Sequence, residues 1–143
     1  GKPAALIALY ESASRRGLQV LKEAIDPARD WQTQVDQALS AYLSSLAQNP
    51  VLLRTLFVEI LGLGATGLAV RRRVHDFMAD FMLDVINAGR GPARLEPPMA
   101  LAVVGGIHEL VLQALEQGRG HALSELAGPA GRLLRAVVRT QTG

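Results

Sequence analysis

The side chains that could take part in chemistry are few and lie far apart in the sequence. The chain has three histidines, His75, His108 and His121, and no cysteine. None of the three stands with a second histidine or a carboxylate in a recognised metal-site arrangement. No Ser-His-Asp order, phosphate-binding glycine loop or convergent pair of carboxylates is evident either. We therefore expect no metal, no other cofactor and no enzymatic activity.

Two polar residues interrupt apolar stretches and are candidates for contact with a bound molecule. Glu59 lies in the most apolar segment, where burying an unpaired carboxylate is costly. It should meet an arginine, a hydroxyl, water or a ligand, or else lie on an exposed side. His108 lies on an apolar stripe between Leu101 and Leu112, where a neutral imidazole could hydrogen-bond a ligand. The simpler interpretation of His108 is a hydrogen bond to a neighbouring helix.

Apolar side chains from several segments could line one cavity around these two residues. Aromatic rings would form its walls, and methionines would make those walls adaptable. Together with the two polar candidates, the predicted lining residues are Trp31, Tyr42, Leu56, Phe57, Glu59, Phe77, Met78, Phe81 and His108. Ordinary core packing accounts for the aromatic residues equally well.

Three consecutive arginines, Arg71, Arg72 and Arg73, lie in the middle of the chain. Neighbouring positions point in different directions around a helix, so these residues do not form one phosphate-binding stripe. Arg72 can pair with Asp76 one turn later. We predict that this segment is a solvated face.

Periodic apolar residues predict the elements that position these side chains. Leu, Ala and Val dominate, only 4% of residues are aromatic, and apolar positions recur at intervals of three and four. Asp30 is a candidate N-cap, and Asn49-Pro50 should end one helix and begin the next. The expected helices cover about residues 3–25, 31–48, 50–62, 70–88, 98–117 and 121–137.

The details of these helices predict an architecture. Segment 50–62 is apolar around most of its circumference and should be the central helix. Glycines from Gly62 to Gly67 predict a break, and Gly89 to Pro98 predicts the longest loop. Pro129 should kink the last helix. Strand-like alternation and repeats are absent from the sequence, so we predict an all-α fold with a single six-helix domain over residues 1–143.

The last two predicted helices should pair with a second copy of the chain. Helix 98–117 carries two apolar stripes, which implies two buried contacts, and Gly105-Gly106 favours a close approach of helices there. A twofold axis would join the last two helices of each copy into a four-helix bundle. The predicted interface residues of this homodimer are Val111, Leu112, Leu115, Leu126, Ala130, Leu133 and Val137.

Charge and hydropathy exclude two classes of partner for this segment. The 15 basic and 13 acidic residues are spread along the chain, unlike the clustered positive face of a nucleic-acid-binding surface. The longest apolar stretches are interrupted by Arg54, Glu59, His108 and Glu109, and no N-terminal signal pattern is visible. We expect no membrane association and a cytoplasmic location.

The order of these elements resembles the regulatory domain of the TetR family of transcriptional regulators. Tyr42-Leu43, Asn49-Pro50 and Leu52-Leu53-Arg54, followed by Val58 to Gly62, are similar to the family's second and third regulatory helices. The segment Val104 to Val111 is similar to the penultimate helix of many members.

The resemblance implies an effector-binding and dimerisation domain, and a repressor in which a small, apolar or aromatic effector controls DNA affinity. Family members carry a three-helix DNA-binding unit ahead of this region, whereas this sequence begins at Gly1 in what looks like the first regulatory helix. DNA binding is therefore expected only through an N-terminal helix-turn-helix outside this chain. The alternative is a helical protein-protein interaction and dimerisation module without a ligand pocket.

Overall fold

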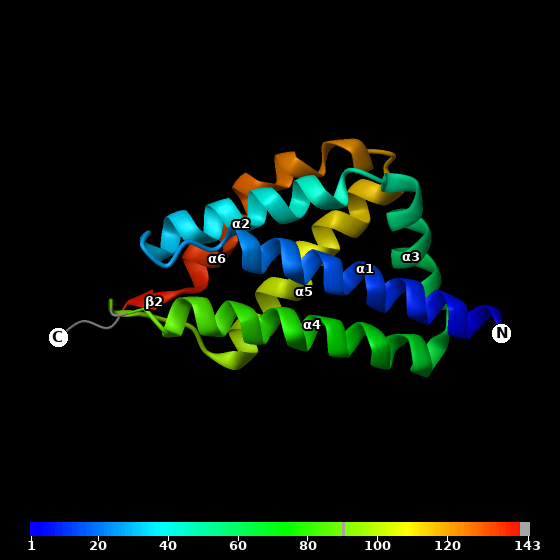
Figure 1. Cartoon of the computed structure of the whole chain (residues 1–143), viewed down its shortest axis with the longest axis horizontal. Coiled ribbons are helices and arrows are strands. Elements are labelled where there is room, and N and C mark those ends of the chain that lie inside the picture. Colours follow the sequence, from blue (N-terminus) through cyan, green and yellow to red (C-terminus); the bar gives the residue numbers. More distant parts are fainter. Residues whose placement is uncertain (90, 141–143) are drawn as a thin grey trace.

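The computed structural model describes residues 1–89 and 91–140, and the protein is all-α, as predicted (Figure 1). Six α-helices and one 3-10 helix make up nearly all of this described part of the chain. They are α1 (Lys2–Ala24), α2 (Trp31–Leu46), α3 (Pro50–Gly62), α4 (Gly64–Asn87), α5 (Pro97–Glu116), the 3-10 helix η1 (Gly120–Leu126) and α6 (Ala127–Val137).

Capping residues end and begin the helices where the sequence indicates. The Asp30 side chain accepts a hydrogen bond from the Thr33 backbone N–H, so it is the N-cap of α2. Asn49 caps α3 in the same way through Leu52, and Pro50 occupies the first turn, where a helix needs no N–H donor. Both predictions are confirmed.

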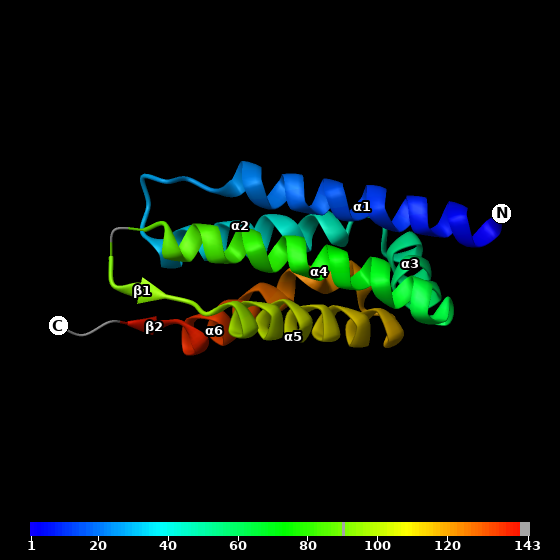
Figure 2. The ribbon, with the colours of Figure 1, turned by 90° about the horizontal axis from the view of Figure 1, so that it is seen from below.

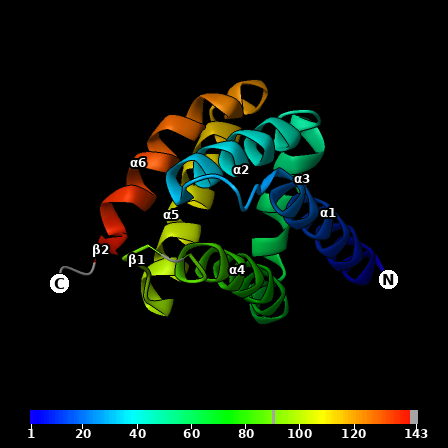
Figure 3. The ribbon, with the colours of Figure 1, turned by 60° about the vertical axis from the view of Figure 1, so that its left-hand side comes forward.

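The most deeply packed helix is α5, and the prediction that α3 is central is wrong. Eight residues of α5 are buried, and the helix packs against α3, α4, α6 and η1. It runs between α4 on one side and α2 and α6 on the other (Figure 3). Helix α3 lies toward the end of the molecule that holds the N-terminus, and its Val51, Val58 and Leu61 are exposed (Figures 1 and 2).

A tight junction joins α3 to α4, shorter than the predicted glycine-rich break. Gly64 has φ of +63°, a conformation that glycine adopts without strain. A Cβ on Gly67 would overlap the carbonyl oxygen of Ile60, so only glycine lets the first turn of α4 approach the end of α3. Helix α4 therefore begins at Gly64, earlier than predicted.

The C-terminal part differs from the single kinked helix that was predicted. The 3-10 helix η1 comes first, and α6 then begins at Ala127. Pro129 lies in the first turn of α6, where its missing N–H costs no hydrogen bond, so it introduces no kink. A two-residue antiparallel pair, β1 (Ala93–Arg94) with β2 (Arg139–Thr140), joins the predicted loop to the end of the described chain. The sequence does not predict this pair.

Helix α5 is long and apolar enough to cross a membrane by length and composition alone. In the fold its apolar side chains pack against neighbouring helices, as those of a core helix do. This packing is compatible with a soluble protein.

Candidate functional site

A buried pair of polar side chains, Tyr42 and His108, lies in the middle of the helical core. Tyr42 comes from α2 and His108 from α5, and the Tyr42 hydroxyl oxygen is 2.8 Å from His108 Nε2. The other ring nitrogen, Nδ1, is 2.8 Å from the Val104 carbonyl oxygen one turn earlier in α5. Gly17 of α1 makes room for this arrangement, because a Cβ there would lie 2.8 Å from the Tyr42 ring.

These contacts fix the protonation state of His108. A carbonyl oxygen only accepts, so Nδ1 carries the proton and Nε2 accepts from the Tyr42 hydroxyl. Burial lowers the pKa of His108 to about 4, against the opposing effect of the Val104 hydrogen bond. Burial likewise raises the pKa of Tyr42. Both side chains are therefore neutral at pH 7, and both nitrogens of His108 are satisfied by neighbouring groups.

A second histidine, His75 of α4, stacks on His108. The ring centroids are 4.8 Å apart with an angle of 26° between the planes. Burial, and then the nearby His108 and Arg71, lower the pKa of His75 to about 3, so this ring is also neutral at pH 7. No hydrogen bond to the His75 ring is found within the described residues.

An apolar cavity, here called the central cavity, extends from this pair among α1, α2, α4, α5 and α6. Leu39, Met78, Phe81 and Met82 contribute to its walls, and Tyr42 and His108 supply its polar edge. Its volume is about 60 Å³, enough for a small group, since one water needs roughly 10–15 Å³. Flexible methionine side chains can move to admit a larger ligand.

Two smaller cavities reach His108 from the α3 side. One, between α1 and α3, is lined by Leu56 and Phe57 and measures about 20 Å³. The other is here called the polar pocket; it measures about 10 Å³, and its polar lining residues are Tyr10, Arg71, His75 and His108. His108 is thus the residue that all three cavities share.

The structure brings together most, but not all, of the residues predicted to bind a ligand. Tyr42, Leu56, Phe57, Met78, Phe81 and His108 line these three cavities. Glu59 is exposed on α3, and Phe77 is 60% exposed on α4, so neither reaches them. Trp31 is half-buried at the edge of the core and lines none of the three. The rotation of α3 and of α4 about its own axis places Glu59 and Phe77 on the solvent side.

Sequence reasoning missed three members of the site: Tyr10, Arg71 and His75. The arginine run predicts a solvated face, but Arg71 is half-buried and lines the polar pocket. A signal was available, because Arg71, Val74, His75 and Met78 have the spacing of one helix face. The predicted Arg72–Asp76 ion pair does not occur; the ion pairs within the described residues involve other side chains.

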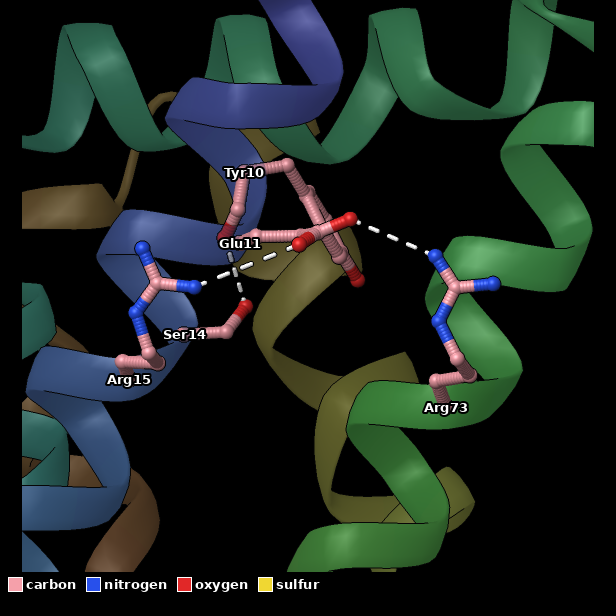
Figure 4. Close-up of polar contacts among 5 residues, drawn as sticks. All are labelled: Tyr10, Glu11, Ser14, Arg15 and Arg73. Atoms are coloured by element: carbon pink, nitrogen blue, oxygen red, sulfur yellow. Dashed lines mark hydrogen bonds and ion pairs between the residues drawn. The ribbon is translucent and has the colours of Figure 1, made fainter.

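A surface groove between α1 and α4 lies beside the central cavity, and one ion pair crosses it. Glu11 accepts from Arg73 at 3.3 Å and lies 4.0 Å from Arg15, while the Ser14 hydroxyl donates to the Tyr10 carbonyl oxygen (Figure 4). Met78 lines both this groove and the central cavity. Exposed pairs of this kind add little stability, about 1 kcal/mol or less.

The residues predicted to form a dimer interface divide into two groups. Val111, Leu115 and Ala130 are at most 2% exposed in the single chain, so they belong to its own core. Leu112, Leu126, Leu133 and Val137 are half-buried. The outward sides of α5 and α6 carry other small or apolar residues beside Leu133 and Val137, together with the exposed polar residues Glu109, Gln113 and Arg132. This surface, here called the outer face, comprises Ala102, Gly106, Leu110, Leu133, Ala136 and Val137.

Within the described residues, no group of three or more acidic or histidine side chains is placed to hold a metal ion. Comparison with models of protein families, with curated proteins and with solved structures finds no match for the chain.

Proposed function

We propose that this chain is the effector-binding and dimerisation domain of a TetR-type transcriptional regulator, a repressor whose DNA affinity responds to a small, largely apolar ligand. One observation carries the proposal: an apolar interior cavity is edged by a neutral Tyr–His pair at the meeting point of three cavities. Apolar walls with a few convergent polar groups are typical of small-molecule sites.

The position of this site suits a switch. Helices α1, α2, α4, α5 and α6 all contribute to the central cavity, so a ligand there contacts most of the bundle at once. A ligand that fits one arrangement of these helices better than another shifts the population toward it. In a dimer, such a shift would change the separation of two DNA-binding units outside this chain. The resemblance in sequence pattern supports this role, with a cytoplasmic location.

Binding of small apolar probes tests the ligand site. Titration with a panel of alkylbenzenes and alkylphenols, followed by calorimetry and thermal shift, should reveal saturable binding. Phe81→Trp puts a larger side chain into the wall of the central cavity and so narrows it. This should weaken binding at least about tenfold, which corresponds to a loss of roughly 1.4 kcal/mol of binding free energy. Phe77→Trp makes the same change at an exposed position outside that cavity and should leave binding unchanged.

The competing function is a dimerisation module with a closed, fully packed core. The small volume of the central cavity, about 60 Å³, is the observation in its favour. Absence of saturable binding across the panel, together with a stable dimer, would support that module and reject the effector-binding role.

A further inference from the structure

Arg71 is a half-buried cation that lines the polar pocket and has no ion-pair partner within the described residues. It shares a face of α4 with the buried residues Val74, His75 and Met78 and is itself half-buried. Within the described residues it forms no ion pair and no side-chain hydrogen bond. Arg73, two residues later, is bound to Glu11 on the opposite side of the α1–α4 groove (Figure 4).

Two further hydrogen-bonding groups face the same polar pocket without a partner. Tyr10 and His75 both line it, and neither the tyrosine hydroxyl nor the imidazole ring forms a hydrogen bond with a described residue. Every fully enclosed side-chain nitrogen or oxygen in the described chain does have a partner. These two groups must therefore remain open to the pocket or to the groove on its outer side. Tyr10 is otherwise only 5% exposed, and His75 only 6%.

The surroundings offer no acid that could neutralise Arg71. Glu11 is engaged by Arg73 and Arg15, and Glu59 is exposed on α3. The neighbouring histidines are neutral, because burial lowers the pKa of His75 to about 3 and of His108 to about 4. Arg71 and Arg72 also line a groove between α4 and α5 just outside His75, with a volume of about 230 Å³. The positive charge thus extends from the surface to the pocket.

We propose that Arg71, with Tyr10 and His75, binds the carboxylate of an amphipathic carboxylic acid whose apolar part occupies the cavities around His108. This inference rests on the proposed ligand-binding function and names its ligand class. The guanidinium fork matches a carboxylate through two parallel N–H···O bonds, and the tyrosine hydroxyl and a neutral imidazole add donors. The donor set selects an anion, and the apolar walls beyond it select a hydrocarbon or aromatic body.

The direct test compares a carboxylate with a neutral ligand of the same shape. Calorimetric titration of the whole chain with octanoate and octanamide, and with 4-butylbenzoate and 4-butylbenzamide, provides two such pairs. A charge-assisted bond at a half-buried site should make each carboxylate bind about tenfold or more tightly than its amide. Equal binding of acid and amide would overturn the inference and leave the ligand-binding function standing. No binding of either, nor of uncharged apolar probes, would reject both.

Matched variants locate the effect. Arg71→Gln should weaken binding of the carboxylate by about tenfold more than binding of the amide, and so remove the preference for the carboxylate. Arg73→Gln makes the same charge change two residues away, outside the polar pocket, and should keep the preference. Arg71→Lys preserves the charge without the fork, so it should give a smaller preference and serves if the glutamine variant does not fold. A preference that survives both Arg71 variants would overturn the assignment.

Discussion

At the scale of single residues, the hydrogen bond between Tyr42 and His108 controls how the interior polar groups behave. Nδ1 of His108 donates to the Val104 carbonyl oxygen, so Nε2 is the ring nitrogen that accepts from the Tyr42 hydroxyl. Tyr10 is also buried, but its hydroxyl has no partner among the described residues. The two tyrosines therefore provide a matched comparison of a satisfied and an unsatisfied hydroxyl.

Tyr42→Phe should destabilise the protein by about 1–3 kcal/mol, because it leaves a buried acceptor on His108 without a donor. Tyr10→Phe removes an unpartnered hydroxyl and should change stability by less than about 0.5 kcal/mol. Urea unfolding followed by circular dichroism gives both values. Equal effects of the two substitutions would show that the Tyr42 hydroxyl contributes nothing beyond its ring.

The two buried histidines predict a pH dependence of stability. Their folded pKa values, about 3 and about 4, lie below the ordinary value of 6.5, so the unfolded chain binds protons first as the pH falls. Their contribution is complete above about pH 6.5 and is lost as the pH falls from 6.5 toward the folded pKa values. Each histidine contributes up to roughly 1.4 kcal/mol per pH unit in this window.

Removing one of these histidines should flatten the pH profile. His75→Gln should reduce the slope of unfolding free energy against pH between about pH 6 and pH 4.5. His121→Gln makes the same change at an exposed position in η1 and is the matched control. Comparing the two variants separates the effect of His75 from effects that both variants share. Parallel slopes in all three proteins would contradict the assignment of His75.

At the scale of elements, helix approach distances decide where side chains are tolerated. The α3–α4 junction depends on Gly67, which lies against the Ile60 carbonyl. Gly105, in the middle of α5, has nothing within 4 Å of the position that a Cβ would occupy. Two glycines within helices therefore have opposite constraints, although glycine lowers helix propensity at both.

Alanine substitution should separate these constraints. Gly105→Ala should stabilise the protein by about 0.5–1 kcal/mol, because alanine is the better helix former and meets no neighbour. Gly67→Ala should destabilise it by about 2 kcal/mol or more, because the junction has to open. Thermal unfolding midpoints of both variants check the signs, and a stabilising Gly67→Ala would contradict the packing described at this junction.

At the scale of the whole molecule, the outer face of α5 and α6 is where we expect a second copy. Ala102 and Ala136 are exposed, and Leu133 packs over Gly106 while remaining half-exposed to solvent. Small and apolar residues on two adjacent helices allow close packing against the same helices of a partner. The resulting four-helix bundle keeps the predicted architecture but relocates its contacts outward from Val111, Leu115 and Ala130.

Charge at this face should break the dimer. Leu133→Glu should shift the chain from dimer to monomer in light scattering across a concentration series. The dissociation constant of the dimer should rise at least about tenfold. Ala102→Glu, at an exposed position that leaves the single-chain core intact, should act in the same direction. Leu9→Glu alters an exposed leucine on α1 and is the control. A chain that remains dimeric in both test variants would place the interface elsewhere.

The sequence by itself determined the helical class, the helix order and most helix ends, because apolar periodicity, prolines and capping residues such as Asp30 act locally. It also indicated His108 and most of the apolar walls. Only the tertiary structure decided which helix is central, that Glu59 is exposed and that Arg71 lines the polar pocket. These outcomes depend on the rotation of each helix and on neighbours distant in sequence. Local periodicity does not encode that Tyr42 meets His108 across 66 positions.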